Sequence, residues 1–292
     1  MRLPVRLSGA TLCAVVGTPI AHSRSPLIHR LFAEQFGITL QYERVEVAPG
    51  ALAEALERLR NLGCRGVNVT VPLKEEAASI ALERTACVEL AGAANTLWWT
   101  DANLLAADNT DGTGLLNDLT RNWGLNLAGK RLLLLGAGGA AAGVIAPLLA
   151  AKPAILQIIN RNQARAEALV ERFQTLGPLC VVLNSALASV PDLLINATSA
   201  GVQQAVPEFP LGTVAATTYC YDMFYATGET PFLRHVRELG AVHVRDGFGM
   251  LVEQAAASFQ RWHGVCPDTG AVMTGLRPYR AAEKTHEFEF GA

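Results

Sequence analysis

The stretch from Leu132 to Ala151 carries no polar side chain, and it constrains the fold more than any other feature of the chain. A run of this length could cross a lipid bilayer as one helix. However, four glycines and Pro147 interrupt it and lower both the helix propensity and the hydrophobicity of the segment. A buried strand, a tight glycine turn and a helix account for the stretch better, so we expect a soluble α/β protein.

Composition agrees with a large buried core. Of the 292 residues, 50% are apolar and 17% are charged, against about 25% charged residues in an average soluble protein. This excludes a disordered or collagen-like chain, and the length favours two domains or one large one. The formal net charge of −2 gives no reason to expect nucleic acid or an anionic membrane as a partner.

The cysteines and the N-terminus bear on the compartment in which the protein works. Six cysteines are scattered without a C-x-x-C pair or a histidine cluster, so we expect neither a disulfide framework nor a metal site. The apolar run Leu12–Val16 that follows Arg2 and Arg6 is too short for the core of a signal peptide. We therefore predict a cytoplasmic protein with reduced thiols.

Short runs of β-branched residues or leucine alternate with helical patterns along most of the chain. Such alternation predicts βαβ units with a mostly parallel sheet. The predicted strands are Leu12–Val16, Tyr42–Val47, Gly66–Val71, Arg131–Leu135, Ile155–Asn160, Cys180–Leu183, Leu193–Ala197, Tyr219–Asp222 and Val242–Val244. The predicted helices are Pro26–Phe36, Leu52–Leu62, one from about Lys74, Leu115–Trp123, Ala140–Ala151, Ala164–Gln174 and Val252–Trp262.

The segment Leu132–Ala141 fits a strand that runs into the sequence G-x-G-x-x-A and then a helix. The first glycine, Gly136, allows the tight turn, and Gly138 lets a pyrophosphate approach the backbone. Ala141 is small enough for close packing of helix and strand, and the amides at the helix start favour a phosphate. The pattern predicts a dinucleotide-binding turn, with a merely structural glycine turn as the alternative.

The residues after the next strand indicate which dinucleotide binds. An NAD site places Asp or Glu about 20 residues after the glycine turn to hold the ribose 2′-hydroxyl. This chain has Asn160-Arg161-Asn162-Gln163-Ala164-Arg165 there, without an acid. Arg161 and Arg165 can converge on one anion if a helix starts near Asn162. We expect NADP, with the two arginines binding its 2′-phosphate; a solvated helix start is the alternative.

A serine pair follows the first predicted strand in His22-Ser23-Arg24-Ser25-Pro26. Pro26 suits the first position of a helix and Ser25 suits its N-cap. Free amides and two hydroxyls at a helix start would receive a carboxylate. A capping serine without a ligand is the alternative.

A second polar motif, Asn68-Val69-Thr70-Val71-Pro72-Leu73-Lys74, ends another strand. Asn68 and Thr70 project from one side of it because side chains alternate along a strand. Lys74 stands at the carboxyl end, where open α/β sheets bind ligands. A lysine held there in a partly dry cleft can exchange a proton with a substrate oxygen. An exposed lysine at a helix start is the alternative.

A third pair of motifs is Gly92-Ala93-Ala94-Asn95-Thr96 and Asp108-Asn109-Thr110-Asp111-Gly112. Asn or Asp near Gly often indicates only a turn. Here the polar residues cluster in segments that otherwise fit buried strand ends, which favours a functional role.

Taken in order, these motifs resemble those of the shikimate dehydrogenase family, from about Cys13 to Trp262. Asn196–Gly201, Tyr221–Tyr225 and Asp246–Ala255 continue the resemblance. With the alternation of elements, it predicts two domains. Residues 1–110 and 247–292 would form an α/β substrate-binding domain with a mostly parallel sheet. Residues 111–246 would form a Rossmann-type NADP-binding domain, after which the C-terminal helices return to the first domain.

The resemblance implies NADPH-dependent, reversible reduction of 3-dehydroshikimate to shikimate, in the pathway to aromatic amino acids, by a monomer or homodimer. Lys74 would be the catalytic residue and Asp111 its partner, with Lys74 either donating a proton or only stabilising charge. The substrate would be bound by Ser23, Ser25, Thr70, Lys74, Asn95, Asp111, Tyr225 and Gln254. NADP would be bound by Gly136, Ala137, Gly138, Gly139, Ala140, Asn160, Arg161, Asn162, Arg165, Thr198, Met223 and Gly247.

Three rival functions are weaker. A quinate/shikimate dehydrogenase using NAD or NADP is the nearest, but use of NAD would require the acid that is missing after the second strand. A non-catalytic NADP-sensing protein would not be expected to keep both Lys74 and Asp111. A folate-linked dehydrogenase of similar form would not be expected to carry Ser23, Ser25 and Tyr225 together.

Overall fold

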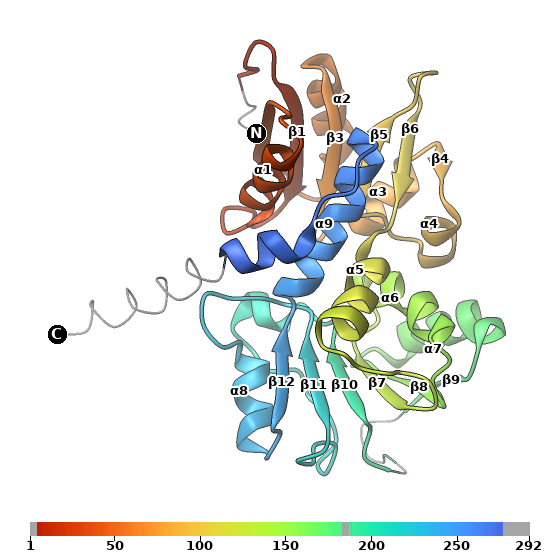
Figure 1. Ribbon diagram of the computed structural model, residues 1–292. Helices are drawn as coiled ribbons and strands as arrows, with labels where there is room; N and C mark the ends of the chain where they lie inside the picture. The colour runs from red at the N-terminus through yellow and green to blue at the C-terminus, as the bar shows by residue number, and fades with distance from the viewer. Residues whose placement is uncertain (1–4, 183–186, 188, 277–292) are drawn as a thin grey trace. The chain divides into compact units, whose positions relative to one another are not determined.

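The computed structural model describes residues 5–182, 187 and 189–276. These residues form two compact α/β units (Figure 1). The first unit contains the described residues up to Gly114 together with Leu251–Val272, and the second contains Leu115–Met250 and the described residues from Met273 onward. The functions and the boundaries that the sequence predicts for the two domains stay predictions. Residues 277–292, predicted as part of the substrate-binding domain, lie outside the described residues.

The first unit is built on a six-stranded sheet with the order β2-β1-β3-β5-β6-β4. Its strands are β1 (Thr11–Gly17), β2 (Leu40–Glu46), β3 (Cys64–Val69), β4 (Glu83–Arg84), β5 (Thr96–Trp99) and β6 (Leu105–Asp108). β1 pairs in parallel with β2 and β3, and β4 does so with β6, whereas β5 runs antiparallel to β3 and β6. The sheet is thus mostly parallel.

Helices pack on this sheet, and three of them carry predicted site residues. They are α1 (Ser25–Gln35), α2 (Leu52–Asn61), α3 (Lys74–Ile80), α4 (Ala86–Ala91) and most of α9 (Phe248–His263), and residues 269–272 are also helical. The indole of Trp262 brings α9 onto the sheet, because its Nε1 donates to the Leu97 carbonyl at 3.1 Å. Gly66 makes room for it: a Cβ there would lie 2.2 Å from the indole.

The second unit is built on a wholly parallel sheet with the order β12-β11-β10-β7-β8-β9. Its strands are β7 (Arg131–Leu135), β8 (Ile155–Ile159), β9 (Leu179–Val181), β10 (Leu193–Asn196), β11 (Tyr219–Asp222) and β12 (His243–Asp246). The order reverses between β7 and β10, and open α/β sheets bind ligands at the carboxyl ends of strands at such a point.

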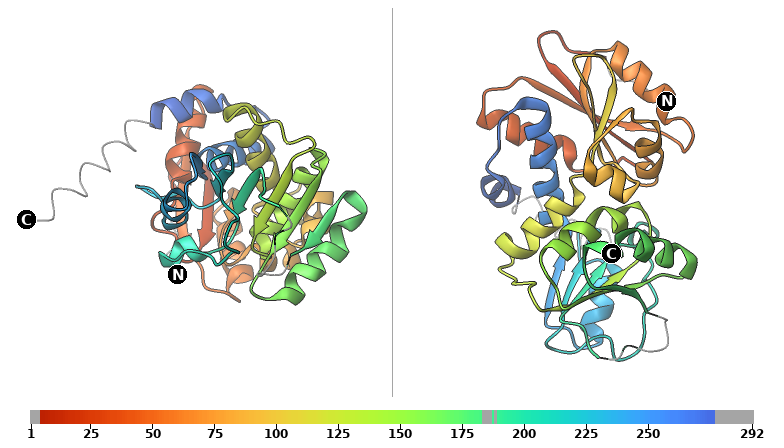
Figure 2. Two further views of the ribbon diagram at one scale, coloured as in Figure 1. Left: turned by 90° about the horizontal axis from the view of Figure 1, so that it is seen from below. Right: turned by 90° about the vertical axis from the view of Figure 1, so that its right-hand side faces the viewer.

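Helices cover this second sheet as a parallel sheet requires. The α-helices are α5 (Asp111–Asn117), which starts in the first unit, α6 (Gly139–Ala150), α7 (Gln163–Phe173) and α8 (Pro231–Glu238). A π-helical turn (Asp118–Asn122) follows α5, and there are two short 3₁₀ turns among the described residues (Gln174–Leu176 and Ala200–Gln203). α7 packs on β8 and β9, whereas α8 packs on β11 and β12 (Figure 2). Leu132–Leu135 are buried between the helical layers, which explains a strand that is apolar at nearly every position.

The predicted fold class is confirmed: the run Leu132–Ala151 forms a strand, a turn and a helix, and α9 returns to the first unit. Among the described residues, no helix has the length and apolarity needed to cross a membrane. Some elements differ from expectation. The helix predicted to begin at Leu115 begins at Asp111, and the strands β4, β5 and β6 and the helices α4 and α8 were not predicted. Ser25 is the first residue of α1 and Arg24 its N-cap, so the N-cap prediction for Ser25 is wrong.

Candidate active site

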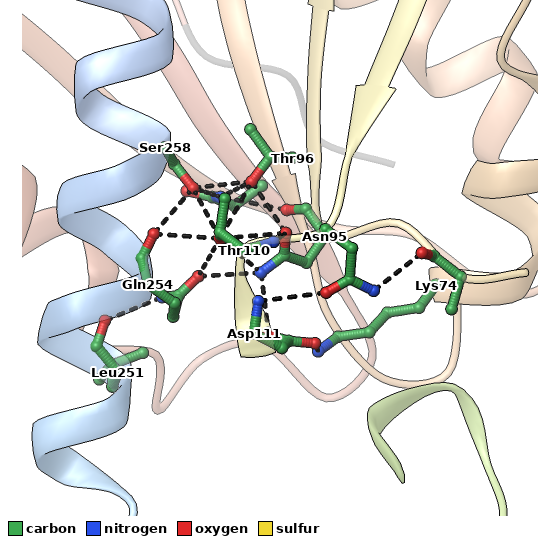
Figure 3. Close-up of polar contacts among 11 residues, drawn as sticks. Lys74, Asn95, Thr96, Thr110, Asp111, Leu251, Gln254 and Ser258 are labelled. Atoms are coloured by element: carbon green, nitrogen blue, oxygen red, sulfur yellow. Dashed lines mark hydrogen bonds and ion pairs between the residues drawn. The ribbon is translucent and has the colours of Figure 1, made fainter. Parts of the chain in front are cut away.

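Lys74 and Asp111 form an ion pair in the first unit (Figure 3). Lys74 is the first residue of α3 and Asp111 the first of α5, so each projects from the start of a helix that follows a loop. The side chains are 14% and 5% exposed, respectively. Water screens such a pair little, so the ammonium is held by the carboxylate in a defined place and keeps a small opening to solvent.

Asn95 organises the other side of the Asp111 carboxylate (Figure 3). Its Nδ2 donates to Asp111 Oδ1 at 2.9 Å and to Gln254 Oε1 at 3.1 Å. Its Oδ1 accepts from the Thr110 backbone N–H at 2.8 Å, which fixes which way the amide faces. Asn95 therefore joins the bend before β5, the start of α5 and the middle of α9 in one buried polar cluster, and the structure brings together four of the predicted substrate residues.

A layer of hydroxyl and amide groups supports this cluster from behind. Ser258 Oγ is 2.7 Å from Thr96 Oγ1, and Asn68 Nδ2 donates to Ser258 Oγ at 2.9 Å. Asn68 Oδ1 in turn accepts from the Tyr42 hydroxyl at 2.7 Å. Sequence reasoning gave no role to Ser258 or Tyr42. The signal for Ser258 was its spacing of one helical turn from Gln254 on α9, which places both on one face.

Ser23 and Ser25 are both buried and close to each other. Ser23 Oγ is 3.3 Å from Ser25 Oγ and also 3.3 Å from the Ser25 backbone N–H. Arg44 Nε donates to the Ser23 carbonyl at 2.8 Å and so holds the loop from β2. The two hydroxyls face the same small region at the start of α1, as a receptor for an oxyanion requires.

Tyr42 connects the serine pair to the layer behind Asn95. Burial raises the pKa of Tyr42 well above its usual value, aided by Cys13 and Cys64, and a hydrogen bond with Ser25 opposes the rise. The phenol therefore stays neutral and donates to Asn68. Thr70 lies one residue beyond β3, with its methyl group against Gly17, where a Cβ would lie 2.4 Å away.

The glycine turn in the second unit has the geometry that close approach of a phosphate needs. Gly136 has a φ of +110°, and a Cβ there would lie 3.2 Å from the Ala197 carbonyl group. Gly138, the N-cap of α6, faces open space, with nothing within 4 Å of an added Cβ. The turn thus leaves the α6 amides accessible to an anion. Gly139 and Ala140 form the first turn of α6, and Ala137 precedes it.

Asn160, Arg161, Asn162 and Arg165 lie at the start of α7. Asn162 is the N-cap, and its Oδ1 accepts from the Arg165 backbone N–H at 3.2 Å. Asn160 Nδ2 donates to the Asn162 carbonyl at 2.8 Å. The side chains of Arg161 and Arg165 are exposed at this helix start. Both are therefore accessible to an anionic ligand.

Thr198, Met223 and Gly247 come together at the carboxyl ends of β10, β11 and β12. Asn196 Oδ1 accepts from Thr198 Oγ1 at 2.7 Å, and the Asn196 carbonyl accepts from the Met223 N–H at 2.9 Å. A Cβ on Gly247 would lie 2.3 Å from the Met223 carbonyl oxygen, so the contact requires glycine. Tyr225, assigned to the substrate by the resemblance, is half-buried in this unit.

The buried carboxyl of Asp222 lies among these residues. Burial raises its pKa to about 6, and hydrogen bonds from Thr230, Phe224 and Asn196 oppose the rise. Sequence reasoning gave this residue no role of its own. Among the described residues, no cluster of His, Cys, Asp and Glu is suited to a metal ion. The six cysteines are free thiols.

Comparisons with known proteins agree with this arrangement. Three family models match in order: the shikimate dehydrogenase substrate binding domain over residues 15–97, shikimate / quinate 5-dehydrogenase over residues 118–205, and the shikimate 5'-dehydrogenase C-terminal domain over residues 247–276. The NADP(+) shikimate dehydrogenase of Hahella chejuensis is 46% identical over 264 residues, which cover 90% of this chain and 97% of the relative. That of Thioalkalivibrio sulfidiphilus is 49% identical over 266 residues, covering 91% and 97%.

A solved structure shows the same fold. It is the shikimate 5-dehydrogenase of Thermus thermophilus in complex with NADP(H) and shikimate, with a TM-score of 0.80 and 32% identity, and the match covers 94% of this chain and 99% of that one. Similarity of this extent, along nearly the whole of the relatives, settles the family. The chain belongs to the shikimate dehydrogenase family.

Proposed function

We propose that the protein catalyses the reversible, NADPH-dependent reduction of 3-dehydroshikimate to shikimate, in the pathway that supplies aromatic amino acids. The observation that carries the proposal is the Lys74–Asp111 ion pair in a buried polar cluster, where Asn95 donates both to Asp111 and to Gln254. Such a cluster can bind several ring hydroxyls and a reacting oxygen together, because it offers ammonium, carboxylate and amide groups in fixed positions.

The serine pair of the first unit supports binding of an acid. The Ser23 and Ser25 hydroxyls at the start of α1 would hold the substrate carboxylate, and the Tyr225 hydroxyl of the second unit would add a donor. Thr70, Asn95, Asp111 and Gln254 would bind the ring hydroxyls and the reacting oxygen. A ring acid with hydroxyl groups matches both parts of this donor set.

The second unit supports binding of NADP. The residues Gly136 to Ala140 would hold the pyrophosphate, and Asn160, Arg161, Asn162 and Arg165 would hold the adenosine 2′-phosphate. Thr198, Met223 and Gly247 would lie at the nicotinamide end. When bound, NADPH supplies the hydride that reduces the ketone carbon.

Lys74 would act where the negative charge develops. As the ketone carbon receives the hydride, charge builds on the ketone oxygen, and the Lys74 ammonium stabilises it. The ammonium either donates a proton to that oxygen or keeps its proton while water supplies one. Asp111 orients the ammonium in either case, because Asn95 fixes the second carboxylate oxygen. The products are the ring alcohol and the oxidised cofactor, and in reverse Lys74 receives the proton or stabilises the alkoxide.

One set of rate measurements separates this function from the nearest rival. Purified protein receives shikimate or quinate with NADP+ or NAD+, and the appearance of reduced nicotinamide is followed by absorbance. We expect the highest kcat/KM for shikimate with NADP+. Fast turnover of quinate with NAD+ alone would refute the proposal. We also propose that the protein works in the cytoplasm as a monomer or homodimer, which cell fractionation and sedimentation would test.

The arginine at the start of α7 provides a matched test of cofactor choice. For Arg161→Ala we expect the KM for NADP+ to rise about tenfold or more, since a charged hydrogen-bonding partner of the 2′-phosphate is lost. The KM for NAD+ should change little. Arg172→Ala, near the other end of α7, is the control and should leave both constants unchanged. Equal effects of Arg161→Ala on both cofactors would show that Arg161 does not contact the 2′-phosphate.

A further inference from the structure

Asp222, the last residue of β11, is 0% exposed and accepts hydrogen bonds from three different segments. Thr230 Oγ1 donates to its Oδ2 at 2.6 Å. Asn196 Nδ2 and the Phe224 backbone N–H donate to its Oδ1 at 2.9 Å and 3.1 Å. A carboxylate suits this place, because each of these neighbours presents a donor to it.

The hydrogen bond to Asp222 fixes the orientation of the Asn196 side-chain amide, and this amide in turn binds Thr198. Because Asn196 Nδ2 faces Asp222, its Oδ1 must face the other way, and there it accepts from the Thr198 N–H at 3.0 Å and from Thr198 Oγ1 at 2.7 Å. The Asn196 carbonyl also accepts from the Met223 N–H. A change at Asp222 would free the Asn196 amide to turn, and Thr198 would lose a defined partner.

The segment after β11 is fixed from the other side. The Phe224 N–H is bound to Asp222, and the Phe224 carbonyl accepts from the Gly247 N–H at 3.1 Å. Met223, which stands between Asp222 and Phe224 in the chain, has its carbonyl oxygen against Gly247, which has no Cβ to block the approach. Thr230 also caps α8, accepting from the Leu233 N–H at 3.3 Å. The Asp222 carboxylate therefore links the ends of β10 and β11 with the start of α8. Through Phe224 it also fixes Gly247, the residue that follows β12.

We propose that Asp222 is a positioning residue for the nicotinamide end of NADP, acting through Asn196 on Thr198 and through Phe224 on Met223 and Gly247. It has no contact with the cofactor itself, since it is fully buried beneath these residues. The inference rests on the proposed function, which gives Thr198, Met223 and Gly247 to the cofactor. It assigns Asp222 only a small effect on the binding of shikimate, because every proposed substrate residue except Tyr225 belongs to the first unit.

The test is Asp222→Asn, which keeps the shape and replaces one acceptor by a donor. We expect the KM for NADP+ to rise about tenfold and kcat to fall, since hydrogen bonds to a charged group are lost. The Kd of shikimate for the free enzyme, measured by calorimetry, should stay within twofold. A kinetic isotope effect with deuterated NADPH should increase, because a misplaced nicotinamide slows hydride transfer. A merely structural residue would not shift this isotope effect.

The control is Asp192→Asn, at a partly exposed aspartate directly before β10, the strand that ends at Asn196. Asp192 also accepts from a backbone N–H, that of Arg131 at 2.9 Å, but lies away from Thr198 and Met223. We expect its NADP+ and shikimate constants to match those of the wild type. Unchanged NADP+ constants in Asp222→Asn would overturn the inference, and so would equal losses of NADP+ and shikimate affinity.

A second pair of variants keeps the test valid if Asp222→Asn does not fold. Thr230→Val removes one donor to Asp222 and should raise the KM for NADP+ by a few fold, and Thr230→Ser should restore it. No change in Thr230→Val, or no restoration by serine, would overturn the inference. An inactive wild type would instead refute the proposed function, whereas an active wild type with unaffected variants would refute the role of Asp222 alone.

Discussion

Replacing Lys74 by Met removes the ammonium and keeps an unbranched side chain of similar length. Asp111 is then left with a nearly buried carboxylate, 5% exposed, that has lost its cation. Breaking a buried pair in this way costs about 3–5 kcal/mol of unfolding free energy. Asn95 still donates to Asp111 and the site is slightly open, so we expect the lower end, about 3 kcal/mol. The double variant Lys74→Met/Asp111→Asn should recover most of this loss, because no buried charge remains.

We expect Lys74→Met to lower kcat strongly and to leave the binding of NADP+ unchanged. Loss of a positioned acid or of a charge at the developing oxyanion each costs about 10²–10³ in kcat, so we expect kcat to fall about 10³-fold, or about 4 kcal/mol of barrier. The Kd of NADP+ should not change, since its proposed binding residues lie in the second unit. Stopped-flow absorbance at saturating shikimate and NADP+ measures the rate, and urea unfolding measures stability.

Lys74→Arg separates the two roles of the lysine. It keeps the positive charge but does not give up a proton readily. Recovery of most of the activity would indicate electrostatic stabilisation alone, whereas activity as low as that of Lys74→Met would indicate proton donation. A fall in kcat of less than tenfold for Lys74→Met would refute a catalytic role for this residue altogether.

Two further predictions concern the glycine turn and a buried histidine. In Gly136→Ala the new Cβ must accept a φ of +110° and a 3.2 Å contact with Ala197, so we expect NADP+ affinity, followed by fluorescence titration, to fall at least tenfold; unchanged affinity would refute the close-approach argument. The pKa of His29 is lowered to about 3, first by burial and then by His263. A lowered histidine pKa gives stability that is full above about pH 6.5 and is lost as pH falls from there toward 3. Wild type should thus lose about 2 kcal/mol more than His29→Phe between pH 6.5 and 4.5, as measured by chemical denaturation at each pH, and parallel losses would contradict the burial of a neutral ring.

The parts of the fold that sequence could predict are those with a strong local pattern. The leucine run before Gly136 and the small residues after it fit only a buried strand, a turn and a packed helix, and the structure has them. The β5–β6 hairpin escaped prediction because its turn depends on Asn103 at a φ of +63°, a residue type that also occurs in ordinary loops.

The site was predictable where residue chemistry is unusual for its setting and not where it is ordinary. Lys74 and Asp111 stand out because charged residues are rare at apolar strand ends, and the structure pairs them. Ser258 and Asp222 do not stand out, because a serine in a helix and an aspartate at the end of a strand are common. Their roles come from partners far along the chain, Asn68 and Thr96 for Ser258 and Asn196 for Asp222, which no local pattern contains.

The central claim is that this chain transfers a hydride from NADPH to the ketone carbon of a hydroxylated ring acid. The most direct measurement gives the enzyme 3-dehydroshikimate and NADPH deuterated at both C4 positions, and identifies the product by nuclear magnetic resonance. We predict shikimate with one deuterium on the carbon that carried the ketone. Unlabelled shikimate, or 3-dehydroshikimate left unchanged while quinate is oxidised with NAD+, would contradict the account.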